Sequence, residues 1–342
     1  MMKICFRVDA NSHIGQGHVM RCLSIALYAR KNKLFDSLFA IADGETEKLF
    51  IDNDFEYLKL GISYKDYSQK SANILIDRLQ AYDIKVIFVD SYYITNYFIN
   101  TVKTRYKTAC FFCKEETMCA DLIVNYNINY NADFYEKNYQ DKSCKLLLGS
   151  KFVPLREEFS SLTHAKKSER KKILFLTGGS DPYNMVDRFL VLSKELAQYD
   201  ITIVIGKYSK VEHINKTTKN VRCIPPSKNI AKIMAENDIV VSAGGTTMYE
   251  LCAIGVPTII YSMADNQISE STYMGQVGCV DYIGDVREGV PFWNKLKESI
   301  NQLANDECKI NKMISMMKNV VDGQGCRRIS EKIMKIGEMK FE

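Results

Sequence analysis

The stretch RVDANSHIGQGHVMRC, from Arg7 to Cys22, gathers residue types that could carry chemistry. Two of the four histidines of the chain, His13 and His18, lie in it beside Gly15 and Gly17. An apolar run precedes the stretch and an amphipathic pattern follows it, which predicts a loop between a strand and a helix. Such a loop could cradle a phosphate, hold a metal ion, carry a catalytic base or simply make a turn.

His18 is the candidate catalytic residue of this loop. It begins the predicted helix, where the positive end of the helix dipole favours a neutral imidazole at pH 7. A neutral imidazole is able to act as a general base, although His18 could also merely cap the helix. His13 is expected to pack within the loop, and no further ligand at suitable spacing makes a metal site of the pair. The dinucleotide fingerprint is absent because Met20 stands where its third glycine belongs.

A second glycine pair, in LTGGSDP from Leu176 to Pro182, follows an apolar run in the second half of the chain. Gly178 and Gly179 are expected to present backbone N–H groups to a phosphate, and Ser180 to add a hydroxyl. A glycine pair after a strand is common, so the motif is informative only together with others. Asp181 suits the start of the helix that is predicted to follow.

The longest motif is VVSAGGTTMYELCAIGVPTIIYSMADNQ, from Val240 to Gln267. It predicts a buried strand, a glycine turn and a helix whose free N–H groups and threonine hydroxyls suit a diphosphate. A carboxylate one turn into this helix could bind a ribose diol or could simply be solvated, and the amides of the later loop could reach the diphosphate or the sugar. The nucleotide contacts predicted here are Gly245, Thr246, Thr247, Glu250, Asn266 and Gln267.

Strand-like and helical runs alternate along the whole chain, which predicts βαβ units with parallel sheets. The expected fold class is α/β, with two Rossmann-like domains that face each other across a cleft. Ligands of such sheets bind at the carboxyl ends of the strands. We expect an N-terminal domain over residues 1–160 and a nucleotide-binding domain over 171–325. A final helix over 326–342 is expected to pack at the domain junction.

Composition restricts the class of protein further. The chain has 342 residues, 46% of them hydrophobic, and a net charge of +5 without a basic stripe, which argues against nucleic acid as a partner. No apolar run reaches the roughly 18 residues that span a bilayer, so we expect a cytoplasmic protein without stable membrane insertion. The pair Cys110 and Cys113 lies in a strand-like run without further ligands, so it predicts core packing rather than zinc. No cofactor and no metal are expected.

Taken together, these motifs resemble the PseG/SpsG group of UDP-sugar hydrolases, which are related to glycosyltransferases of GT-B fold such as MurG. The resemblance covers nearly the whole chain, and the matching pieces occur in the order of the family. Two positions depart from its pattern: Cys113-Lys114-Glu115 replaces an acidic pair, and Tyr126-Asn127 replaces a smaller polar pair. The matching pieces are Gly15–Ala26, Pro154–Phe159, Gly178–Pro182, Ser242–Pro257 and Asp265–Gln267.

The resemblance implies hydrolysis of a UDP-linked 2,4-diacetamido-2,4,6-trideoxyhexose to UDP and free sugar. Such a sugar feeds nonulosonic (pseudaminic-type) acid synthesis for flagellin or surface polysaccharide. His18 would be the base of an inverting attack by water, and Tyr92 a sugar contact. The charged residues that flank the loop could orient His18, bind substrate or pair with one another. The predicted substrate contacts are Arg7, Asp9, Gly15, Gly17, Arg21 and Tyr92.

Two alternatives of other classes remain open. A GT-B glycosyltransferase would use the same donor with a sugar or lipid acceptor, and a nucleotide-sugar-binding protein would bind it without turnover. Release of free sugar together with UDP in the absence of an acceptor separates the hydrolase from both. The expected partner is the UDP-sugar, and the expected state is a monomer or a weak homo-oligomer.

Overall fold

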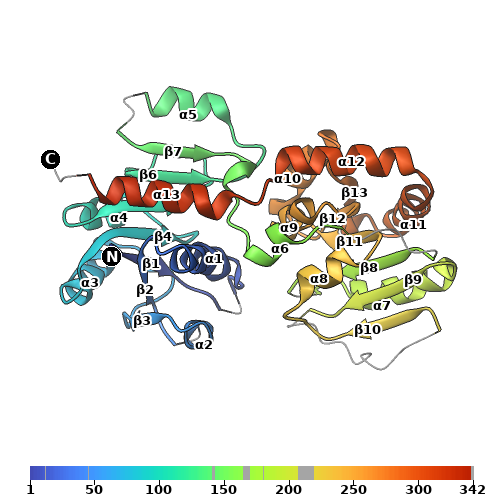
Figure 1. Ribbon diagram of the computed structural model, residues 1–342, viewed down its shortest axis with the longest axis horizontal. Coiled ribbons are helices and arrows are strands. Elements are labelled where there is room, and N and C mark those ends of the chain that lie inside the picture. The colour runs from blue at the N-terminus through green and yellow to red at the C-terminus, as the bar shows by residue number, and fades with distance from the viewer. Residues whose placement is uncertain are drawn as a thin grey trace. The chain divides into compact units, whose positions relative to one another are not determined.

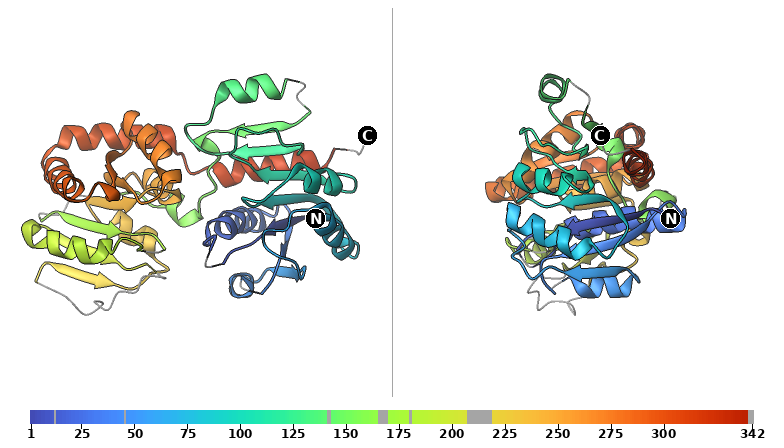
Figure 2. Two further views of the ribbon diagram at one scale, coloured as in Figure 1. Left: turned by 180° about the vertical axis from the view of Figure 1, so that it is seen from behind. Right: turned by 90° about the vertical axis from the view of Figure 1, so that its left-hand side faces the viewer.

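The computed structural model describes residues 1–11, 13–44, 46–140, 143–164, 170–179, 181–206 and 219–339. The chain forms two compact units, one of residues 1–156 with 324–342 and the other of residues 157–323 (Figures 1 and 2). The last helix of the chain therefore belongs to the first unit. Each unit is an open parallel sheet covered by helices on both faces.

Within the described residues, the first unit has a seven-stranded sheet in the order β3-β2-β1-β4-β5-β6-β7, and every neighbouring pair is parallel. Its elements are β1 (Lys3–Val8), α1 (Gly17–Lys31), β2 (Asp36–Ile41), α2 (Glu47–Asp52), β3 (Glu56–Lys59), α3 (Gln69–Leu79), β4 (Ile84–Asp90), α4 (Asn96–Lys103), β5 (Lys107–Phe111), β6 (Leu122–Asn125), α5 (Ala132–Asn138), β7 (Lys145–Leu148), the 3-10 helix η1 (Ser150–Phe152) and α13 (Gly325–Gly337).

The central strands are apolar on both faces because both faces of the sheet are covered. Successive residues of β1 point to opposite sides. Cys5 belongs to the core beneath α3 and α4. Phe6 faces the other side, where its ring lies 5.3 Å from that of Phe39 and 5.6 Å from that of Phe88. Helices α1 and α13 pack against each other on this second face (Figure 1).

Helix α13 begins in close backbone contact with the segment that follows β7. A Cβ atom added to Gly325 would lie 2.0 Å from the carbonyl oxygen of Val153. Two further contacts fix the same end of the helix: the Cys326 thiol donates to the Leu155 carbonyl at 3.3 Å, and Arg328 Nη1 donates to the Lys151 carbonyl at 2.8 Å. Glycine at position 325 is therefore required by space and not by backbone conformation.

Gly325→Ala should lower the free energy of unfolding of the first unit by about 1–3 kcal/mol, because the methyl group must push apart two backbone segments. Denaturant unfolding of the variant against the parent measures this change. Gly44→Ala is the matched control, since its methyl group would meet only the mobile end of the Glu47 side chain. Equal stability of the two variants would contradict the packing described.

The second unit has a six-stranded parallel sheet in the order β10-β9-β8-β11-β12-β13 within the described residues. Phe175 of β8 is central to its core, with its ring 4.0 Å from that of Phe189 and stacked on it. No helix in the described ranges is both long and apolar enough to cross a membrane. The elements are α6 (Glu157–Ser161), β8 (Lys172–Leu176), α7 (Met185–Leu192), the 3-10 helix η2 (Ser193–Leu196), β9 (Asp200–Val204), β10 (Val221–Ile224), α8 (Ile230–Ala235), β11 (Ile239–Ala243), α9 (Thr246–Ile254), β12 (Thr258–Ser262), α10 (Asp265–Gln276), β13 (Asp281–Asp285), the 3-10 helix η3 (Val286–Glu288), α11 (Val290–Asn305) and α12 (Glu307–Val320).

The strand orders place a topological switch point in each sheet. In the first unit the order reverses between β1 and β4, and in the second between β8 and β11. Loops that leave the carboxyl ends of such neighbouring strands diverge to opposite faces and open a crevice, where ligands of these folds bind. The loop before His18 follows β1, and the two glycine motifs of the second half follow β8 and β11. Three of the predicted motifs therefore lie at switch points.

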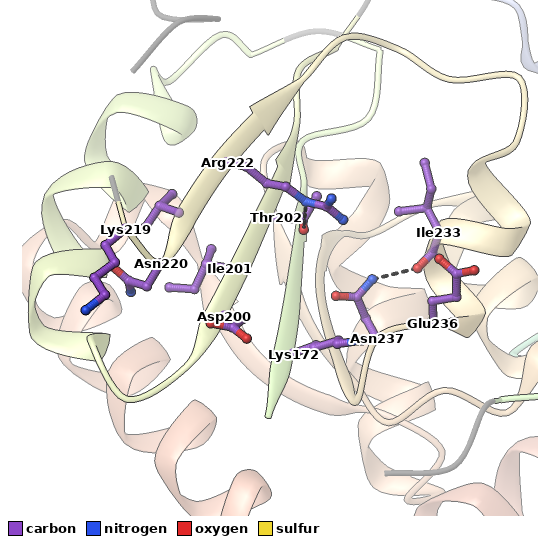
Figure 3. A pocket seen from close by; sticks show the side chains of 11 residues that line it. Lys172, Asp200, Ile201, Thr202, Lys219, Asn220, Arg222, Ile233, Glu236 and Asn237 are labelled. Atoms are coloured by element: carbon purple, nitrogen blue, oxygen red, sulfur yellow. Dashed lines mark hydrogen bonds between the residues drawn. The ribbon is translucent and has the colours of Figure 1, made fainter. Parts of the chain in front are cut away.

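A cavity of about 450 Å³ lies at the amino ends of strands of the second sheet, away from the glycine motifs at the carboxyl ends (Figure 3). Its lining includes the first residues of three strands, Lys172, Asp200 and Val221. Within it, Arg222 Nε donates to Thr202 Oγ1 at 2.9 Å. Because this cavity is at the amino ends of the strands, it is separate from the glycine motifs and is not part of the candidate site.

Candidate active site

His18 lies in the first turn of α1 and is bound to the end of β4. Its side chain is buried, and its Nδ1 atom lies 2.7 Å from Oδ1 of Asp90, the last residue of that strand. Asp90 is paired in the sheet with Val8, the last residue of β1. The imidazole is therefore fixed at the switch point of the first sheet.

The partner of Nδ1 determines which ring nitrogen is basic. An ionised carboxylate only accepts hydrogen bonds, so the tautomer that donates to Asp90 has its proton on Nδ1 and keeps a lone pair on Nε2. Nε2 has no hydrogen-bond partner in the part of the chain that the structure describes. The ring of Tyr92 stands edge-on to the imidazole with 4.4 Å between ring centroids, and 57% of Tyr92 is exposed. The arrangement suits an imidazole that accepts a proton at Nε2.

Arg21 holds the same carboxylate from the next turn of α1. Its Nε donates to Asp90 Oδ2 and its Nη2 to Asp90 Oδ1, both at 2.5 Å, and Nη2 also lies 2.8 Å from His18 Nδ1. Nη1 donates to the hydroxyl of Tyr126 at 2.8 Å. Burial alone would raise the pKa of the Asp90 carboxyl, but the charge of Arg21 and the hydrogen bonds from Arg21 and His18 outweigh it and lower that pKa.

Arg7 and Asp9 pair with each other, which is one of the roles that the sequence left open. Arg7 is fully buried, and its Nη1 donates to Asp9 Oδ2 at 2.5 Å. The other carboxylate oxygen of Asp9 accepts from the backbone N–H of Ala42 at 2.7 Å. This pair thus ties the end of β1 to the end of β2 and holds the start of the loop before His18.

The loop itself is a tight turn. Gly15 has a φ of +70° and donates its N–H to the carbonyl of Asn11 at 2.9 Å. The Asn11 side chain accepts from the N–H groups of His13 and Ile14. The positive φ explains one of the two glycines that the sequence singled out. Gly17, the first residue of α1, and His13 are both exposed.

Asp90→Asn should lower the free energy of unfolding of the first unit by about 3 kcal/mol at pH 7, because it leaves the Arg21 guanidinium without its carboxylate. The pKa of Asp90 in the folded protein lies below its ordinary 3.8, so this stabilisation is complete above pH 3.8 and is lost as the pH falls through the lower value. In urea unfolding, the difference in free energy of unfolding between parent and variant should be constant above pH 3.8. It should shrink as the pH falls through the lower pKa of Asp90 in the folded protein. Asp83→Asn, at a carboxylate 82% exposed, is the control and should change little.

In the second unit, Gly244 and Gly245 form the turn between β11 and α9. Gly245 precedes the helix with a φ of +127°, which only glycine adopts easily. A Cβ atom on Gly244 would lie 2.6 Å from the hydroxyl oxygen of Ser271, so α10 packs directly against the turn. Thr246 and Thr247 are the first two residues of α9, and Thr246 is exposed. The N-terminus of this helix is thus open to an anionic ligand.

The remaining predicted nucleotide contacts lie on α9 and α10. Glu250 is half-buried, one turn beyond Thr246, and Asn266 is exposed in the first turn of α10. The amide oxygen of Gln267 accepts from the N–H of Met263 at 2.8 Å, so it stabilises its own loop. A pair that the sequence did not single out lies nearby: the Tyr249 hydroxyl donates to the Glu270 carboxyl, and burial raises the pKa of Glu270.

The other glycine motif leaves β8. Gly178 has a φ of +81°, and Gly178 and Gly179 are exposed, whereas Ser180 lies outside the described residues. Asp181 accepts from the backbone N–H groups of Met185 and Val186 at 2.6 and 3.0 Å. Its carboxylate therefore caps α7, as the sequence led us to expect. No group of three or more His, Cys, Asp or Glu side chains within the described ranges is placed to hold a metal ion.

Sequence reasoning missed two parts of the first site. It named Tyr92 as a sugar contact but not Asp90, two residues earlier, and it noted Tyr126 only as a departure from a family pattern, without a role. A carboxylate that directly ends an apolar strand was the available signal for Asp90. Tyr126 gave no such signal, because it reaches Arg21 from 105 positions away in the chain.

The class of protein follows from the two sheets. Each unit has the strand order of a complete Rossmann-type sheet, and the whole chain has the fold of solved GT-B proteins. MurG of Acinetobacter baumannii superposes with a TM-score of 0.71 at 10% identity, covering 98% of this chain and 100% of that one. The chain therefore has a GT-B fold, and the predicted fold class is confirmed.

Sequence similarities narrow the comparison. Residues 173–329 match the Glycosyltransferase family 28 C-terminal domain. An uncharacterised protein of Methanocaldococcus jannaschii is 27% identical over 292 residues, which cover 80% of this chain and 57% of that protein, so this chain spans little more than half of its length. The UDP-2,4-diacetamido-2,4,6-trideoxy-beta-L-altropyranose hydrolase of Campylobacter jejuni is 26% identical over 288 residues, which cover 81% of this chain and 97% of the hydrolase.

Proposed function

We propose that this protein is an enzyme acting on a UDP-sugar, and that it hydrolyses a UDP-linked 2,4-diacetamido-2,4,6-trideoxyhexose to the free sugar and UDP. The similarity to the Campylobacter jejuni hydrolase over 81% of the chain supports this substrate class. The product would enter nonulosonic (pseudaminic-type) acid synthesis for flagellin or surface polysaccharide, in the cytoplasm. The GT-B fold supports a nucleotide sugar as substrate more broadly.

One observation carries the proposal: His18 keeps Nδ1 on Asp90 and leaves Nε2 without a partner among the described residues. Nε2 would take a proton from water while the water oxygen bonds to the anomeric carbon. The bond from that carbon to the UDP oxygen breaks, and UDP leaves with the electron pair, which inverts the anomeric centre. Asp90 would stabilise the imidazolium formed in this step.

The second unit would bind UDP. The exposed start of α9 at Thr246 and the backbone of Gly178, Gly179 and Gly245 would hold the diphosphate, whose charge grows as it leaves. Glu250 would accept from the ribose hydroxyls. UDP is a good leaving group, so this mechanism needs neither a strong general acid nor a metal, unlike that of glycosidases with two carboxylates.

The proposal predicts that the enzyme releases UDP and free sugar in equal amounts without an acceptor. A panel of UDP- and GDP-linked diacetamido-trideoxyhexoses, followed by NMR of the products, tests the substrate and the inversion together. Turnover should be confined to a UDP-linked member, with the anomeric configuration inverted in the first product. Retention of configuration, or absence of turnover across the panel, would refute the mechanism or the substrate class.

His18→Asn should lower kcat about a hundredfold or more on the substrate found, because water then loses its base. UDP affinity, measured by calorimetry, should stay within twofold of the parent, since UDP is assigned to the other unit. His13→Asn, at an exposed histidine of the same loop, is the matched control and should keep parental kcat. Turnover by His18→Asn within a few-fold of the parent would remove His18 as the base.

A glycosyltransferase is the second candidate, and the match of residues 173–329 to a glycosyltransferase domain favours it. This enzyme would consume the UDP-sugar only when a sugar or lipid acceptor is present. Turnover that depends on an added acceptor, with no free sugar formed, would select it over the hydrolase. UDP binding without turnover under either condition would select a nucleotide-sugar-binding protein.

A further inference from the structure

The guanidinium of Arg21 is held by hydrogen bonds and by ring contacts within the first unit. Its guanidinium makes a bidentate contact with the Asp90 carboxylate, and a third nitrogen, Nη1, donates to the Tyr126 hydroxyl. The guanidinium carbon lies 4.9 Å from the ring centroid of Phe111 and 5.7 Å from that of Tyr126. Only 16% of the side chain is exposed. The guanidinium nitrogens of Arg21 are therefore directed at protein groups and not at a ligand.

The charges around His18 form a balanced set. Asp90 is buried and negative, Arg21 is its cation, and His18 shares the same carboxylate oxygen. The Cys22 thiol lies 3.7 Å from the second carboxylate oxygen, and burial raises its pKa, so it contributes no charge. The ring of Tyr92 is nearly perpendicular to the imidazole, at 83°. Arg21 is thus the group that neutralises Asp90 without placing a second proton on the imidazole.

We propose that Arg21 and Tyr126 are positioning residues that keep His18 Nε2 unprotonated and correctly oriented. The proposal rests on the proposed function, in which Nε2 takes the proton from water. If Arg21 is removed, the buried carboxylate is left with His18 as its potential cation. A proton on both ring nitrogens then becomes favourable, because a buried unpaired charge is costly. A doubly protonated imidazole cannot accept the proton of the attacking water.

Tyr126 makes the arrangement specific. It follows β6 directly, and its hydroxyl accepts from Arg21 Nη1, the nitrogen that does not bind Asp90. This hydrogen bond fixes the rotation of the guanidinium about its long side chain, so that Nε and Nη2 meet the two carboxylate oxygens together. The tyrosine that departs from the family pattern thereby acquires a role: it connects the loop after β6 to the base through Arg21 and Asp90.

The test uses Arg21→Met, Arg21→Lys and Tyr126→Phe in the full chain. Nitrogen-15 NMR of labelled histidine reports which ring nitrogens are protonated, and the His18 signals are identified by their loss in His18→Asn. In the free parent protein at pH 8, we expect a proton on Nδ1 and none on Nε2. Arg21→Met should add a proton to Nε2 in a measurable fraction of molecules, Arg21→Lys less, and Tyr126→Phe should give the smallest change.

Kinetics supply the second readout. Arg21→Met should lower kcat roughly tenfold to a hundredfold, a part of what a general base contributes, with KM within twofold of the parent. Tyr126→Phe should lower kcat several-fold. Arg327→Met, at a half-buried arginine of α13 paired with Glu331, and Tyr97→Phe, at an exposed tyrosine of α4, are the matched controls for the two substitutions. Denaturant unfolding of each variant against the parent shows that the first unit, which carries both substitutions, is folded.

The outcomes separate the two proposals. Parental His18 signals in both Arg21→Met and Tyr126→Phe would overturn the positioning role, and so would a rise in KM with unchanged kcat, which would indicate a substrate contact. If Arg21→Met does not fold, Tyr126→Phe alone decides by the same criteria. If the NMR changes occur as expected but the parent hydrolyses no UDP-sugar, the positioning role stands and the proposed function fails.

Discussion

The arrangement around His18 depends on the buried carboxylate of Asp90. It ends β4 beside the end of β1, where the strand order reverses. Burying a carboxylate is costly unless it is paired and fully hydrogen-bonded. Arg21 and His18 meet this requirement, and both come from the first two turns of α1. The requirement that Asp90 be paired therefore also fixes the start of α1 on the sheet and the orientation of the imidazole.

At the corresponding switch point of the second unit, backbone conformation and not a buried charge fixes the start of the helix. At its switch point Gly245 has a backbone conformation that other residues adopt only with strain, and Gly244 lies against Ser271 of α10 with no room for a side chain. The helix that follows this turn begins at Thr246, which is exposed. Such a site suits a diphosphate, whose charge is large and whose shape is simple.

The two departures from the family pattern differ in what surrounds them. Tyr126 is packed into the network that holds Asp90. Cys113-Lys114-Glu115 follows β5 on the exposed side, and the Glu115 carboxylate accepts from the side chain of Asn131, which caps α5. The first departure thus belongs to the hydrogen-bond network of Asp90 and His18. The second lies on the exposed surface of a loop.

The sequence by itself determined the alternation of strands and helices and the glycine turns, because these are local patterns of polarity and backbone freedom. The edge strands β3 and β13 show little of this alternation in the sequence, since short strands with mixed polarity, such as Glu56–Lys59, carry little periodicity. Only the tertiary structure decided the partners of His18 and Arg21. Asp90 lies 72 positions from His18, and Tyr126 lies 105 positions from Arg21. It also decided that α13 returns to the first unit. Contacts of this kind depend on strand order and crossover, which no local pattern of residues encodes.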